Sequence, residues 1–144
     1  ALGNIGSAEA INSLESLLDD PEPQVRLHSV IALGKIGGSS TVPLLKRMLT
    51  DIEPNVRWDA AIGLAKQKDS SGRSILLDLL NRKYLNSFPN IDEKEKVQVM
   101  LVAISVAHFI QNPELKTRLM DINSNENNLK IREAARIALG KFII

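Results

Sequence analysis

A 31-residue repeat constrains this chain more than any other feature of its sequence. The sequence Ala-Leu-Gly-Asn-Ile-Gly at residues 1–6 returns as Ala-Leu-Gly-Lys-Ile-Gly at residues 32–37, and in part at residues 138–142. A second pattern, Asp-x-x-Pro-x-Val-Arg, begins at Asp20 and again, after the same interval, at Asp51. Two linked patterns with one period indicate a repeat architecture, in which each unit packs against its neighbours.

The stretches between these patterns have helical periodicity. Apolar residues at positions i, i+3, i+6 and i+7, which share one face of a helix, begin at Ile11 and again at Val42. Aromatic residues make up only 3% of the chain, so the core is aliphatic, which suits helix-on-helix packing. We therefore predict four antiparallel pairs, each an A helix followed by a B helix: 8–19 with 23–36, 41–50 with 54–67, 71–82 with 93–110, and 113–122 with 127–142.

Prolines, glycines and small polar residues mark the expected ends of these helices. Pro23 and Pro54 stand where B helices begin, a position that tolerates a missing N–H group. Gly6 and Gly37 fit left-handed caps at helix C-termini. The expected N-caps are Ser7, Ser40 or Thr41, Ser70 and Asn112.

The predicted fold is an all-α α-solenoid, a superhelix of about four stacked helix pairs in a single domain, residues 1–144. Residues 83–92 interrupt the 31-residue step and form an insertion loop in the third repeat, which we expect to be the most mobile segment. Because residues 1–6 match the end of a repeat, we expect the chain to be a fragment of a longer array. Its true N-terminus and any targeting signal would then lie elsewhere.

Composition excludes several classes of function. The chain has no cysteine, so disulfides, zinc–thiolate sites and cysteine nucleophiles are impossible. Lys and Arg number 18 against 17 Asp and Glu, and a net charge of +1 gives no long-range attraction to nucleic acid or acidic membranes. No apolar run reaches the roughly 18 residues of a membrane span. We expect a cytoplasmic protein with no membrane or nucleic-acid partner.

The two repeated patterns resemble the HEAT-like repeats first grouped with the phycobilisome lyases. The resemblance covers nearly the whole chain, is specific in the first two repeats, partial in the fourth and weak in the third. It implies an all-α superhelix whose B helices line a concave face. The roles it implies are mostly protein–protein binding, although some members attach bilins, some hydroxylate through a metal, and distant helical-repeat relatives excise alkylated DNA bases.

Few residues suggest catalysis or a bound cofactor. His28 and His108 lie in different repeats and neither precedes a glutamate, so the paired His-Glu motifs of repeat-type iron hydroxylases are absent. Residues 34–40 contain three glycines but lack both a preceding strand and the Lys-Ser/Thr of a phosphate loop, which favours a helix end and turn. We expect no catalytic residue, metal or cofactor, and a lyase-like activity stays open through the resemblance alone.

Two pairs of residues could be taken for acid–base catalytic groups: Asp20 with Arg26, and Asp51 with Arg57. The two members of each pair lie six residues apart across an expected turn, and the backbone groups of a turn need hydrogen-bond partners. We therefore interpret both pairs as structural, tying the end of an A helix to the start of the following B helix. In HEAT repeats, equivalent residues form ladders between neighbouring repeats.

A helical wheel of residues 23–36, drawn with about 100° per residue, separates two faces. We assign one of them to the packed core: it holds Val25, Ser29, Ala32, Leu33 and Ile36. The opposite face carries residues at i, i+4 and i+8, which we name the B-helix stripe and predict to bind a partner. The stripe consists of Leu27, Ile31, Lys35, Trp58, Ile62, Lys66, Glu133, Ile137 and Lys141. In the third repeat the same offsets reach Gln98, Val102 and Val106, where a buried core is an equal explanation.

The B-helix stripe is apolar in its centre, has lysines at one end and contains the only tryptophan, Trp58. Exposed apolar surface bordered by charge is typical of protein interfaces, and tryptophan is enriched among interface hot spots. We therefore predict a non-catalytic scaffold that binds a protein or peptide on the concave face, with Trp58 pointing away from the core. The alternatives are a bilin lyase-like accessory subunit and a helical-repeat nucleic-acid binder, the latter disfavoured by nearby acids such as Asp59 and Glu133.

Overall fold

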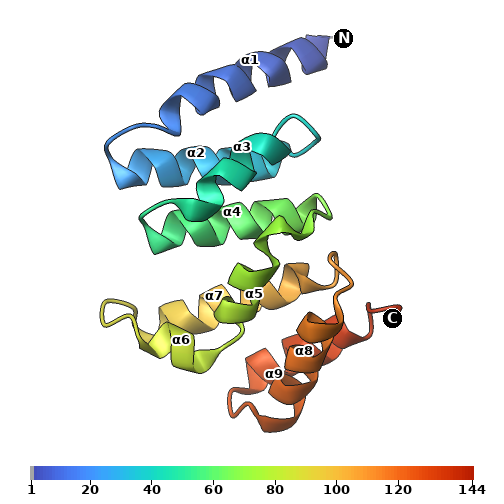
Figure 1. Cartoon of the computed structure of the whole chain (residues 1–144). Coiled ribbons are helices and arrows are strands. Elements are labelled where there is room, and N and C mark those ends of the chain that lie inside the picture. Colours follow the sequence, from blue (N-terminus) through green and yellow to red (C-terminus); the bar gives the residue numbers. More distant parts are fainter. Residues whose placement is uncertain (1) are drawn as a thin grey trace. The chain divides into compact units, whose positions relative to one another are not determined.

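The computed structural model describes residues 2–144, with side chains from Ser7 onward, and all regular structure in that range is helical (Figure 1). The all-α prediction is therefore confirmed. The chain divides into two compact units, Ala1–Gly72 and Arg73–Ile144. Each unit contains two antiparallel pairs of an A helix and a B helix, as the repeat predicts.

The first unit pairs α1 with α2 and α3 with α4. The B helices α2 and α4 run side by side, and α3 packs against α4 (Figure 1). Short 3₁₀ turns extend two of the A-helix segments. The elements are α1 (Leu2–Leu17), α2 (Pro23–Ile36), α3 (Val42–Arg47), η1 (Met48–Thr50), α4 (Pro54–Lys66) and η2 (Ser70–Gly72).

The second unit pairs α5 with α7 and α8 with α9, and carries one additional short helix, α6, between α5 and α7. The B helices α7 and α9 pack against each other, and α8 lies along α9. The elements are α5 (Arg73–Leu79), α6 (Arg82–Asn86), α7 (Glu93–Ala107), α8 (Pro113–Asn125) and α9 (Leu129–Leu139).

Helix boundaries follow the punctuation signals at most positions. Helix α2 has the predicted range 23–36, with Pro23 in its first turn, and Gly37 ends it with a left-handed φ of 69°. Asn112 caps α8 by accepting hydrogen bonds from the N–H groups of Glu114 and Leu115 at 2.9 and 3.2 Å. Two of the expected caps, Gly37 and Asn112, and the first-turn Pro23 were therefore correctly placed by residue type alone.

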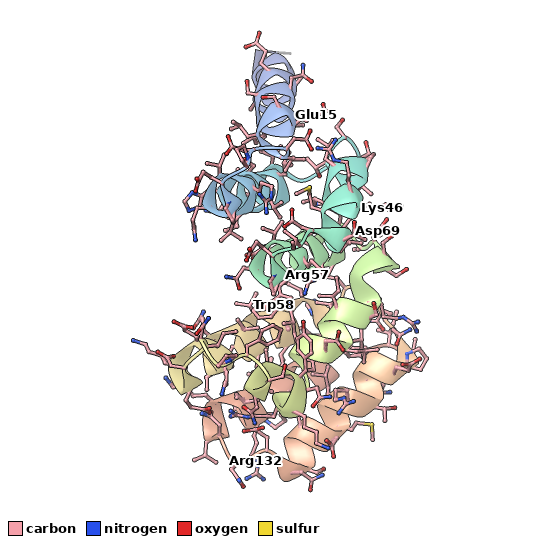
Figure 2. The ribbon with its side chains drawn as sticks, turned by 60° about the vertical axis from the view of Figure 1, so that its left-hand side comes forward. Glu15, Lys46, Arg57, Trp58, Asp69 and Arg132 are labelled. Carbon is pink, nitrogen blue, oxygen red and sulfur yellow. The ribbon has the colours of Figure 1, made fainter. Side chains whose placement is uncertain are left out.

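Several boundary predictions are wrong: the expected helix 71–82 is two helices, α5 and α6, and the expected helices 93–110 and 127–142 end earlier, at Ala107 and Leu139. Helix α1 runs without a break from Leu2 to Leu17, so neither the Gly6 end nor the Ser7 cap exists; Ala1 and the side chains of residues 2–6 lie outside the described part. After α4, the turn is capped by Asp69 instead of Ser70, because the Asp69 carboxylate accepts the N–H of Ser71 at 2.8 Å. Lys46 of α3 approaches the same carboxylate at 3.4 Å (Figure 2).

The core of the first unit is aliphatic, and the burial of each side chain of this size stabilises the fold by about 1.5–3 kcal/mol. Val30, which the wheel left out of the packed face, is fully buried, whereas Ile36, which the wheel placed there, is 39% exposed. The packed side of α2 is therefore rotated from the predicted one. The core residues are Leu18, Val30, Leu33, Leu45, Met48, Val56, Ala60 and Leu64.

A pair of glycines sets the approach of α2 to α4. A Cβ atom added to Gly63 would lie 3.3 Å from the Cα of Gly34 and 3.1 Å from Cδ1 of the buried Leu45. Glycine is therefore favoured most strongly at residue 63, whereas a Cβ atom at Gly34, in the repeated Ala-Leu-Gly pattern, would meet Gly63 at an ordinary contact distance of 3.5 Å. No side chain separates the two B helices at this point.

The Asp–Arg pairs are structural, and their geometry repeats. Arg26 forms a two-point ion pair with Asp51 of the next repeat at 2.9 and 3.1 Å, and its Nη1 donates to the carbonyl oxygen of Asp20 at 2.9 Å. Arg57 likewise donates to the carbonyl oxygen of its own Asp51 at 2.8 Å. Burial raises the pKa of Asp51, but hydrogen bonds from Arg26 and from the Glu53 N–H outweigh it and hold that pKa below its usual range.

The insertion at residues 83–92 is folded in part. Its first residues belong to α6, Leu85 is fully buried, and the rings of Tyr84 and Phe88 meet edge to face with centroids 5.1 Å apart. Asp92 then caps α7 by accepting the N–H of Glu95 at 2.8 Å. The exposed positions lie between these anchors, and the mobility of the segment stays a prediction.

Candidate functional site

The B-helix stripe is only partly at the surface. On α2, Leu27 and Ile31 are half-buried and Lys35 is exposed. In the fourth repeat all three stripe residues are exposed: Glu133 and Ile137 on α9, the latter with 48% of its surface accessible, and Lys141 just after the helix. Of the described stripe residues, the three at the end of the second unit are therefore exposed to a partner, whereas only Lys35 is exposed on α2 and only Lys66 on α4.

The expectation that Trp58 and Ile62 point to solvent is wrong. Trp58 on α4 is 4% exposed and Ile62 is 8% exposed, although Lys66 at the end of the same helix is exposed (Figure 2). The wheel assumed that one face of a B helix packs and the other is free. Six consecutive residues of α4, 60–65, are buried, so in this part of the helix the face that carries Ile62 is covered as well as the opposite face.

A groove between α7 and α9 contains the exposed part of the stripe in the second unit. It encloses about 190 Å³, its walls are mostly apolar, and Ile137 and Lys141 of the stripe belong to it. From here on it is called the α7–α9 groove. Its walls are formed by Leu101, Ile104, Ser105, His108, Ala134, Ile137, Ala138 and Lys141.

The residues that α7 contributes differ from those that the repeat alignment indicated. Val106 is a core residue, 3% exposed, and the groove is formed instead by residues one position earlier in each turn, such as Leu101 and Ser105. Helix α7 has no Val-Arg signature from which to fix its register. The spacing of apolar residues along α7 was the only sequence signal that could have identified the groove residues of this helix.

Gln111 fixes the end of the groove. Its backbone is left-handed, with a φ of 53°, and its side chain Nε2 donates to the carbonyl oxygens of His108 and Lys141 at 2.6 and 3.1 Å. Its Oε1 accepts the N–H of Ile143 at 2.8 Å. One side chain thus joins the end of α7 to the chain that follows α9. The positions of His108 and Lys141 on either side of the groove are therefore set by the fold.

His108 contributes an uncharged ring to the groove wall. Burial lowers the pKa of its imidazole, the charge of Lys141 lowers it further, and a backbone hydrogen bond with Ser105 acts in the opposite direction. The imidazole is therefore neutral at physiological pH. Its Nδ1 atom is buried, so the ring offers the groove mainly its hydrocarbon surface.

The second unit carries an excess of positive charge, part of it on α9 and at Lys141 in the groove wall. The second unit has 11 Lys and Arg against eight Asp and Glu, a net charge of +3, whereas the first unit has seven against nine, a net charge of −2. The only acid on α9, Glu133, is bound by Arg136 through two contacts of 2.9 and 2.6 Å. The cations Lys130, Arg132 and Lys141 therefore face solvent without an acidic partner on their own helix (Figure 2 for Arg132).

Other hollows and motifs offer less. A hollow of about 570 Å³ beside α6 has polar walls, and its charged groups Arg82, Glu93 and Glu126 are already paired with one another. The glycine turn after α2 is closed by Gln67, whose Oε1 accepts the N–H of Gly38 at 2.8 Å. Among residues 2–144, no three His, Cys, Asp or Glu side chains gather closely enough to hold a metal ion, and none of the helices there is long and apolar enough to span a membrane.

Comparison with known proteins agrees with this architecture. A family model for HEAT repeats matches residues 11–85, and a model for the PBS lyase HEAT-like repeat matches residues 1–20. No curated protein sequence matches the chain significantly. Among solved structures, human deoxyhypusine hydroxylase in complex with glycerol aligns with 98% of this chain at a TM-score of 0.57 and 18% identity. The chain spans 46% of that structure, and at this identity the likeness concerns the fold alone, an α-solenoid.

Proposed function

Because the chain belongs to the HEAT-repeat family, we propose that it is a non-catalytic scaffold that binds a segment of another protein on its B-helix face. The B helices are α2, α4, α7 and α9. A family of this kind fixes the architecture without fixing the activity, so the function has to be argued from the surface.

The α7–α9 groove is the observation that carries the proposal. It is apolar inside, the 48%-exposed Ile137 stands in its wall, and Lys141 lies beside it. An exposed apolar depression with a charged border is the usual form of a protein-binding site. Its volume of about 190 Å³ is below the roughly 300–1,000 Å³ of typical small-molecule sites, which favours a peptide side chain over a bilin or another cofactor.

A matched pair of variants tests the proposal. Ile137 and Met120 are both exposed aliphatic residues of the second unit, 48% and 53%, but Met120 lies on the A helix α8 outside the groove. Partners are purified on the immobilised wild-type chain, identified, produced separately and titrated by calorimetry. Ile137→Glu is expected to weaken binding at least tenfold, and Met120→Glu to leave it within twofold.

The same purification separates the alternative functions. A bound bilin would give the eluate a visible absorption band, and a nucleic acid would be removed by nuclease and show a steep loss of affinity with salt. A purified protein partner that binds Ile137→Glu as tightly as the wild type would place its site elsewhere and contradict the proposal.

A further inference from the structure

We infer that the α7–α9 groove accepts an acidic peptide segment with one large aliphatic or aromatic side chain, which enters the groove while its neighbouring carboxylates lie against Lys141 and the cations of α9. This inference rests on the proposed function and specifies its partner. Three features of the second unit support it: the size of the groove, the distribution of charge around it, and the state of the buried imidazole in its wall.

The size of the groove matches a single side chain. A volume of about 190 Å³ corresponds to roughly six water molecules at their liquid volume. That is the space of one leucine, isoleucine or phenylalanine side chain. The walls at Leu101, Ile104 and Ala138 are hydrocarbon, so expulsion of this water by an apolar group is favourable at roughly 25 cal/mol per Å² of buried surface.

The charge on α9 selects the flanking residues. Glu133 is engaged by Arg136, so it cannot attract a basic peptide without breaking a two-point ion pair. Lys130, Arg132 and Lys141 make no ion pair with any described acid. Carboxylates on the peptide gain attraction from these cations, and a basic peptide is repelled by the same groups. Such an arrangement determines which partner binds and how fast it associates.

The inner wall of the groove stays apolar because His108 is uncharged. His108 and Lys141 both line the groove, and a second positive charge beside Lys141 in a mostly hydrocarbon wall would be costly to bury. The attraction for carboxylates therefore comes from the rim, where Lys141 is exposed, and the interior is left for the apolar side chain.

Four capped heptapeptides test the inference on the 144-residue chain. Three have a central leucine flanked by glutamates, lysines or serines, and the fourth has glutamates around a central alanine. Binding is measured from amide chemical-shift changes in the ¹⁵N-labelled protein. The glutamate–leucine peptide is expected to shift amides of α7 and α9 around the groove, and the lysine–leucine and glutamate–alanine peptides to bind at least tenfold more weakly.

Charge reversal provides the matched control. Lys141→Glu is expected to weaken the glutamate–leucine peptide at least fivefold and to strengthen the lysine–leucine peptide. Lys83→Glu reverses the same charge at an exposed position of α6, away from α9 and outside the groove wall, so its effect should be less than twofold. Raising the salt concentration should reduce the difference between the acidic and the serine peptides.

The outcomes separate the inference from the proposed function. Equal or stronger binding of the lysine–leucine peptide, or no shift from any peptide at millimolar concentration, overturns the inference about the partner. The scaffold function is judged independently by the effect of Ile137→Glu on a purified protein partner. If that partner still depends on Ile137 while the acidic peptide does not bind, the groove is used by a segment of different chemistry.

Discussion

Arg82 of α6 forms a two-point ion pair with Glu126, in the turn between α8 and α9, at 2.9 and 3.3 Å. Arg26 and Asp51 have the same relationship in the first unit. Both acids also accept a backbone N–H from the residue two positions later, at 2.9 Å for Asp51 and 3.2 Å for Glu126. Helix α7 lacks the Val-Arg signature, and the inserted helix supplies the arginine from another part of the chain.

Arg82→Ala is expected to destabilise the second unit by about 2 kcal/mol, the scale of a lost hydrogen bond to a charged group. The loss leaves the Glu126 side chain, which is 11% exposed, without its main partner. Chemical denaturation followed by circular dichroism measures the change. Arg47→Ala is the control, because its pair with Asp19 is exposed and 3.4 Å long and should contribute less than about 1 kcal/mol. Equal effects of the two substitutions would contradict the structural role of Arg82.

The same ion pair predicts a dependence of stability on pH. The hydrogen bond from Arg82 lowers the pKa of Glu126, with burial acting against it and the Asn128 N–H in support. A carboxyl whose pKa is lower in the folded state stabilises the fold above its ordinary pKa, and this contribution is lost as the pH falls through the lowered value. Arg82→Gln should therefore show a smaller loss of stability between pH 5 and acid than the wild type, measured by urea titrations at a series of pH values. If the free energy of unfolding fell equally steeply with decreasing pH in the variant and in the wild type, the pH dependence could not be assigned to the Arg82–Glu126 pair.

Gly63→Ala is expected to destabilise the first unit by about 1–3 kcal/mol, the usual cost of adding a methyl group to a packed core. Its Cβ would lie 3.1 Å from Leu45 and 3.3 Å from the backbone of Gly34. Gly34→Ala is the milder partner variant, because its Cβ meets Gly63 at an ordinary contact distance of 3.5 Å. In thermal unfolding, the melting temperature should be highest for the wild type, lower for Gly34→Ala and lowest for Gly63→Ala. A Gly63→Ala protein as stable as the wild type would mean that α2 and α4 can separate at low cost.

Trp58 is expected to behave as a core residue. At 4% exposure its emission should be blue-shifted and resistant to quenching by iodide or acrylamide. Trp58→Ala should lower the free energy of unfolding by about 3–5 kcal/mol, the range for removal of a buried aromatic side chain. Because it is the only tryptophan in the chain, its fluorescence is measured without interference. A red-shifted, readily quenched signal would restore the earlier hypothesis that it contacts a partner.

Much of the fold could be predicted because its signals are local. Pro23 and Pro54 each open a B helix, and both stand at one position of the repeated pattern. The role of Arg26 was also readable from the sequence, since a turn with unpaired carbonyl groups needs a donor nearby. These features depend on residues close together in the chain or separated by one known period.

The site was harder to predict because it depends on which faces of a helix are covered. The wheel placed Ile137 and Lys141 correctly at the surface but treated α4 in the same way, although η2 and α3 pack against it in addition to α2. Helix α7 lacks the Val-Arg signature that would fix its register in the repeat, so Leu101 and His108 were not recognised as neighbours of Ile137. Long-range packing of this kind leaves no periodic trace in one sequence.

The contact between Gly34 and Gly63 also limits how this chain can change over generations. A methyl group at residue 63 would press on Leu45 and on the backbone of Gly34, so its effect depends on the residues at both of those positions. Related chains should therefore retain glycine at position 63, and those with a larger residue there should have a smaller residue than leucine at position 45. Positions on α2 and α4 that share no polar contact are therefore expected to change together in evolution.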